Sequence, residues 1–141
     1  MIRRTMKLLW TNLVLVCMLL VSLSVSAGAA VIDSPEISPQ YTGVARIKAT
    51  LEVSDTGYAT CYGTVTPNDG YSVDFTLQLK RDGVAIKTWN NSGTSTLSID
   101  KGYYLTPGYD YQVVATAKVK NSSGTIVETA TAKSVVVSYK N

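Results

Sequence analysis

The chain has 141 residues, with 13 Lys and Arg, 10 Asp and Glu, and no histidine. The absence of histidine excludes Ser-His-Asp and Cys-His nucleophile pairs and the usual zinc sites. Three of the 13 basic residues lie in the first seven positions and all ten acids follow residue 30, so residues 31–141 carry ten charges of each sign. A net charge of zero leaves no basic field to attract nucleic acid or anionic lipid.

The first 30 residues have the three parts of a secretory signal peptide. Arg3, Arg4 and Lys7 form a basic start, Leu13–Val21 is an unbroken apolar run, and residues 26–30 are all small or tolerated at an exit site. This order predicts a secreted protein that touches the membrane through residues 1–30 during export.

Cleavage is expected after Ala27, Ala29 or Ala30, because each follows a suitable residue two places before it. The alternative is an uncleaved membrane anchor, since the looser apolar run Leu8–Val25 approaches spanning length. Polar residues interrupt that run and favour cleavage: Thr11, Asn12, Ser22 and Ser24.

Residues 31–43 contain Pro35 and Pro39 among polar residues and are expected to form an extended lead-in. Residues 44–141 are expected to form one domain with a single core. Its first strand, 44–53, alternates cleanly, and we expect the inward side chains to be Ala45, Ile47, Ala49, Leu51 and Val53.

Further alternating segments follow, at 58–66, 72–80 and 84–89, separated by turn signals at 67–70 and at Asp82–Gly83. Asn90–Asn91–Ser92–Gly93 predicts another turn, and 94–99 a fifth strand. After the segment 111–120, a last strand from 125 to about 139 changes its inward parity midway, which a β-bulge would explain. Seven strands and no helical period predict an all-β, two-sheet sandwich of the immunoglobulin or fibronectin III type.

Leu105, Pro107, Gly108 and Tyr111 precede alternating apolar residues, in the pattern Leu-x-Pro-Gly-x-x-Tyr-x-Val-x-Ala. This pattern resembles the corner that enters strand F of fibronectin type III domains. The resemblance implies that the Tyr111 hydroxyl bonds to upstream backbone, as in many immunoglobulin-like sandwiches. The second strand departs from that family, since it lacks the usual tryptophan and holds Cys61.

The chain as a whole resembles a group of short secreted proteins of Gram-positive bacteria, in which a β domain begins near an Ile-Ser-Pro-Gln-Tyr-like segment. Here that segment is residues 37–41. The resemblance implies a bacterial source and export, and it implies no substrate.

Residues that carry chemistry are scarce, so we expect no enzyme, no catalytic residues, no cofactor and no metal. Cys61 is the one cysteine after residue 30, which excludes an internal disulfide there, and we expect it to be buried and inert. The acids are spread one to a turn or strand, which does not favour a glycosidase pair or a calcium loop.

Aromatic residues are the one surface feature that suggests a function. Tyr58 and Tyr62 share the expected outer face of one strand, and Trp89, Tyr103 and Tyr104 are expected in or beside turns. Tyrosine gives rigid contact area with a polar tip, although strands favour it anyway. The sequence therefore suggests a secreted module that binds an unknown protein or glycan with these residues. The alternative is a structural or adhesive module that self-associates through a sheet edge.

Overall fold

The computed structural model describes residues 40–140; the expected signal peptide, residues 31–39 of the lead-in and Asn141 lie outside this part. Residues 40–140 form eight strands and no helix, and thus no helix that could span a membrane. The strands are β1 (Val44–Val53), β2 (Tyr58–Pro67), β3 (Ser72–Arg81), β4 (Val84–Gly93), β5 (Leu97–Tyr104), β6 (Tyr109–Lys120), β7 (Ile126–Lys133) and β8 (Val137–Tyr139).

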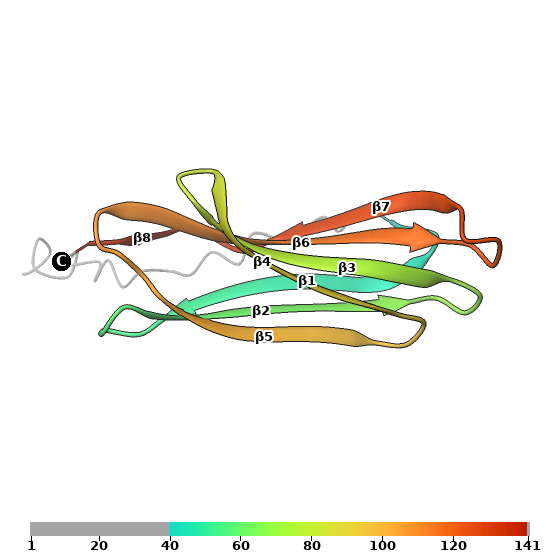
Figure 1. Cartoon of the computed structure of the whole chain (residues 1–141), viewed down its shortest axis with the longest axis horizontal. Helices are drawn as coiled ribbons and strands as arrows, with labels where there is room; N and C mark the ends of the chain where they lie inside the picture. Colours follow the sequence, from blue (N-terminus) through green and yellow to red (C-terminus); the bar gives the residue numbers. More distant parts are fainter. Residues whose placement is uncertain (1–39, 141) are drawn as a thin grey trace, which may run out of the picture. The chain divides into compact units, whose positions relative to one another are not determined.

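The strands form two antiparallel sheets that lie as two layers (Figure 1). The smaller sheet has the order β1-β2-β5. The larger sheet has the order β4-β3-β6-β7, and β8 pairs with the first residues of β6. Connections cross between the layers after β2, β4 and β5, and the fold is the expected immunoglobulin-like β-sandwich.

The core lies between the two layers and is built by strict alternation. In β2 and β3 every second residue is buried, because side chains of a strand point to opposite faces of its sheet. The largest fully buried side chains come from β2, β3 and β6: Tyr111, Phe75, Leu77, Leu79, Val65, Val73, Val113, Val119 and Cys61.

Tyr111 forms the corner between β5 and β6. Its side chain is 1% exposed, its hydroxyl donates to the Thr106 carbonyl at 2.7 Å, and the same oxygen accepts from the Thr106 N–H at 3.0 Å. This is the bond to upstream backbone that the family resemblance implied. Leu105 is buried beside it, and its N–H donates to the Gly57 carbonyl at 2.8 Å, which fastens the corner to the smaller sheet.

Strand β4 is longer than the sequence indicated. The turn expected at residues 90–93 is wrong, because β4 continues through them and the chain turns between Gly93 and Leu97. The side chains of Asn90 and Ser92 lie on the outer face of this edge strand. Asn90 Oδ1 accepts from the Thr76 hydroxyl at 2.9 Å, and the Ser92 hydroxyl donates to Asp74 at 3.0 Å.

Two further expectations need correction. The register of β1 shifts between Val44 and Arg46, which leaves Ala45 exposed instead of inward. The last strand is divided into β7 and β8, so the sandwich has eight strands instead of seven. The break occurs at Ser134, which is buried: its hydroxyl accepts from Val113 N–H at 2.9 Å and donates to the Val135 carbonyl at 2.8 Å.

Candidate functional site

The five aromatic residues singled out from the sequence belong to two surfaces. Tyr58, Tyr62 and Tyr104 lie on the outer face of the smaller sheet. Tyr58 and Tyr62 alternate with buried residues of β2, and Tyr104 of β5 lies opposite Tyr58. We call these three residues the tyrosine face. Tyr103 and Trp89 have the opposite parity, pack against the core and lie where the two sheets approach each other.

The tyrosine face contains an aromatic pair. The rings of Tyr58 and Tyr104 meet edge to face with centroids 5.0 Å apart, an arrangement that aromatic pairs prefer. Tyr58 also lies over Gly102, where a Cβ would collide with the Tyr58 hydroxyl, so the ring covers bare backbone of an edge strand. Tyr104 remains 71% exposed and Tyr58 40%, which leaves aromatic area open to a partner.

Tyr62 extends the face along β2. It is half-buried and lies opposite Thr50 on one side and Asp100 on the other. Thr60 and Thr64 flank it on the same side of the strand. The surface around the tyrosines is therefore rich in hydroxyl groups, and neither pocket described below includes these three residues.

Trp89 and Tyr103 lie beside the opening between β4 and β5. Both are half-buried, and Lys87 Nζ lies 5.7 Å from the centre of the Tyr103 ring, within the range of a cation–π contact. A groove of about 630 Å³ runs between the strands, lined by Thr88, Trp89, Asn90, Asn91, Ser98, Ile99, Asp100 and Lys101. Trp89 was expected in or beside a turn and lies instead in the middle of β4, whereas Tyr103 and Tyr104 are the last residues of β5, beside the corner.

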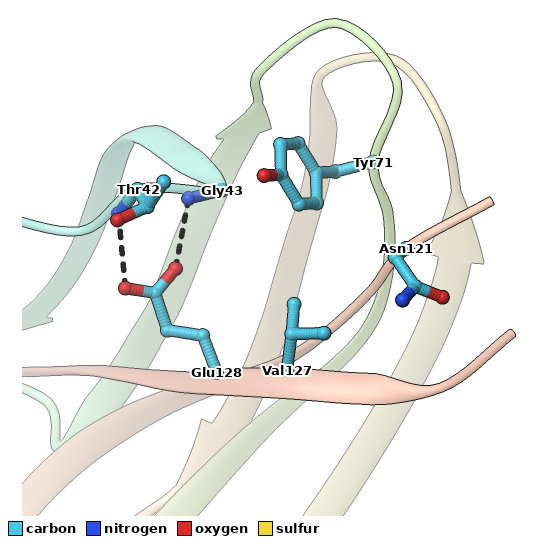
Figure 2. A pocket seen from close by; sticks show the side chains of 6 residues that line it. All are labelled: Thr42, Gly43, Tyr71, Asn121, Val127 and Glu128. Carbon is cyan, nitrogen blue, oxygen red and sulfur yellow. Dashed lines mark hydrogen bonds between the residues drawn. The ribbon is translucent and has the colours of Figure 1, made fainter. Parts of the chain in front are cut away.

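A second pocket, which the sequence did not indicate, lies where the lead-in reaches the domain (Figure 2). It measures about 350 Å³ and is lined by Thr42, Gly43, Tyr71, Asn121, Val127 and Glu128. The Glu128 carboxylate accepts from the Thr42 N–H at 3.0 Å and from the Gly43 N–H at 2.8 Å. In the sequence Glu128 is one of the scattered acids, and nothing near it indicates a partner 85 residues away.

The lead-in also contacts β7 at Thr131, three residues after Glu128. The Tyr41 hydroxyl accepts from the Thr131 N–H at 3.1 Å and lies 3.4 Å from the Thr131 carbonyl, to which it donates. The two contacts together fasten residues 41–43 along β7. Because Glu128 already accepts two backbone N–H groups, this pocket serves first to hold the chain to the sandwich.

Cys61 lies in the core with no exposed surface and is unpaired. Burial raises the pKa of its thiol to about 11, with a smaller contribution from the negative charge of Asp100. The thiolate is the reactive form, so the side chain is protonated and inert near neutral pH.

The acids within residues 40–140 do not converge: no group of three or more His, Cys, Asp or Glu there could hold a metal ion. Asp74 pairs with Lys120 at 2.6 Å on the outer face of the larger sheet. The hydrogen bonds from Lys120 and then from Ser92 hold the pKa of Asp74 below its ordinary value.

Comparison with known proteins gives no family. No protein-family model and no curated protein matches the chain. Among solved structures, it is similar to the crystal structure of the CARDB domain of the PF1109 protein from Pyrococcus furiosus in complex with di-metal ions. The identity is 17% and the TM-score 0.47, over 72% of this chain and 98% of that one.

Proposed function

We propose that this protein is an exported, non-catalytic module that binds a partner protein with its tyrosine face. The observation that carries the proposal is the pair Tyr58–Tyr104, in which two aromatic rings in edge-to-face contact remain open to solvent on the outer face of a sheet. Tyr and Trp supply large contact area at low cost in conformational entropy, and they dominate binding energy at interfaces.

A protein fits this surface better than a small molecule, because small molecules require a concave site and neither of the two pockets described includes the three tyrosines. Tyrosines among small hydroxyl residues also resemble the composition of antibody binding surfaces. Residues 31–141 have no net charge to steer a partner, so affinity depends on aromatic area. Retention should then change little between low and physiological salt.

The test uses isolated Gram-positive cell envelopes, with and without prior protease digestion. The protein should be retained on untreated envelopes and lost from digested ones; retention that survives protease would indicate a glycan and overturn the choice of a protein. Changing Tyr62 and Tyr104 together to Ser should abolish retention with a nearly unchanged thermal midpoint. Tyr109→Ser is the matched control, because Tyr109 is 38% exposed and belongs to the other sheet.

Export is part of the same proposal and is tested by mass. The culture medium should contain a chain beginning at Gly28, Ala30 or Val31, the residues after the three expected cleavage sites. Recovery of a membrane-bound chain that still begins at Met1 or Ile2 would overturn it.

A further inference from the structure

The two sheets have five edge strands, because β8 continues the edge of β7, and four of them are short or carry features that hinder pairing with another chain. Strand β1 has a bulge and three charged residues on its outer face, β5 carries Asp100 and Lys101, β7 is bonded to Tyr41 at Thr131, and β8 has only three residues. Charges and bulges on an edge are the usual protection against edge-to-edge association. Strand β4 differs, because it has ten residues, no proline and a single charge at Lys87. Its one bulge lies near the Asp82–Gly83 turn, between Leu79 and Lys80 in the register.

The hydrogen bonds between Tyr41 and Thr131 fix the bonding direction across the larger sheet. They therefore also fix which backbone N–H and carbonyl groups of β4 point away from the sheet, without a partner strand. Thr131 bonds outward to Tyr41 with both its N–H and its carbonyl, so these groups do not bond to β6. In an antiparallel sheet the bonds of successive pairs alternate in direction, so Thr116, opposite Thr131, bonds to Thr76 of β3 instead. Asn90 lies opposite Thr76 on the other side, and its N–H and carbonyl therefore point away from the sheet.

The same alternation leaves the backbone of Thr88 open, two residues before Asn90. Ser92, two residues after Asn90, is not available in the same way, because its outward N–H already donates to Asn91 Oδ1 at 2.9 Å. Within residues 40–140, two residues of the regular part of β4 thus have backbone groups without a partner, Thr88 and Asn90, with Trp89 between them. This arrangement is symmetric about Trp89.

We propose that two copies of this protein pair through β4, antiparallel, about a two-fold axis at Trp89. Thr88 of each copy then pairs with Asn90 of the other, and each pair exchanges two backbone hydrogen bonds. The two Trp89 side chains meet as a directly opposed pair that makes no backbone bonds, the type in which side chains approach most closely. Lys87 faces Asn91 of the other copy, so no like charges are opposed.

A second copy fits this edge better than a foreign strand, since two-fold pairing needs one surface that is complementary to itself. The open residues, the central tryptophan and the placement of the single charge all meet that condition. The interface involves neither Tyr62 nor Tyr104, so this inference goes beyond the proposed binding function and does not depend on it.

The protein is expressed from its full sequence and purified in the processed form that the host produces. Its mass is then measured by sedimentation from micromolar to millimolar concentration. We expect a concentration-dependent dimer, accompanied by a shift in tryptophan emission, because Trp89 is the one tryptophan after residue 30. A protein that remains monomeric throughout would overturn the proposal.

Asn90→Pro removes an N–H that makes no bond within the sandwich, and proline is tolerated where the N–H of an edge strand faces solvent. This variant should remain monomeric at every concentration, whereas Asn90→Ala, which keeps the N–H, should dimerise like the parent. If Asn90→Pro loses the parent's circular dichroism spectrum, Thr88→Lys takes its place, since an edge lysine blocks pairing and keeps the backbone. Dimers of a folded edge variant with parental affinity would overturn the assignment to β4. The Tyr62 and Tyr104 double variant should still dimerise.

Discussion

Removal of the Tyr111 hydroxyl is the sharpest test of how this fold is held together. The hydroxyl makes two bonds to one upstream residue, donating to the Thr106 carbonyl and accepting from its N–H. A hydrogen bond contributes about 0.5–1.5 kcal/mol net, and because Thr106 is exposed, water can partly replace the lost partner. We therefore expect Tyr111→Phe to lower the free energy of unfolding by about 1.5 kcal/mol.

For a domain of this size, that loss corresponds to a midpoint lower by about 6–12 °C, measured by thermal unfolding followed by circular dichroism. Tyr109→Phe is the matched control. The Tyr109 ring contacts Arg81 at 4.6 Å and Tyr111 edge to face, and both contacts survive loss of the hydroxyl. The control should change the free energy by less than about 0.5 kcal/mol. Equal and negligible shifts in the two variants would refute the role of the corner.

Three further predictions concern single groups. Cys61 should not react with thiol reagents in the native protein and should react once unfolded; rapid labelling of native protein would contradict its burial. Glu128→Ala should cost about 1–3 kcal/mol in chemical unfolding, because two N–H groups of the lead-in lose their acceptor, and an unchanged midpoint would mean that water replaces it fully. The Asp74–Lys120 pair should stabilise the fold above the ordinary pKa of Asp74 and lose that effect as the pH falls through its lowered native pKa. Asp74→Asn should therefore flatten the acid side of the stability–pH curve, and a curve identical to the parent's would refute the linkage.

Much of the architecture could be predicted from the local alternation of apolar and polar residues. Strands β2 and β3 alternate without interruption, and β6 departs from alternation only where Val114 is also buried. A buried side chain at every second position leaves one orientation for each strand. The corner at Tyr111 was recognisable because its turn and its strand adjoin in sequence. The aromatic residues were identified as a group, but their division into two surfaces depends on which face of β4 and β5 meets the core.

The failures have a common physical cause. Residues 90–93 have the composition of a turn, yet Thr76 and Asp74 on the neighbouring strand supply partners that hold Asn90 and Ser92 in an edge strand. Glu128 likewise contacts amides 85 residues away. Neither partner is visible in a local pattern, because each is brought close by the fold as a whole.

The Tyr41 hydroxyl, which bonds to both backbone groups of Thr131, also limits how many copies can associate through the larger sheet. If both edges of the larger sheet were free, copies could pair β4 with β4 at one edge and β7 with β7 at the other. A series built in this way has no end. Tyr41 takes both backbone groups that β7 would offer at Thr131. In the proposed dimer, the bonds from Tyr41 to Thr131 therefore hinder the addition of a further copy at β7.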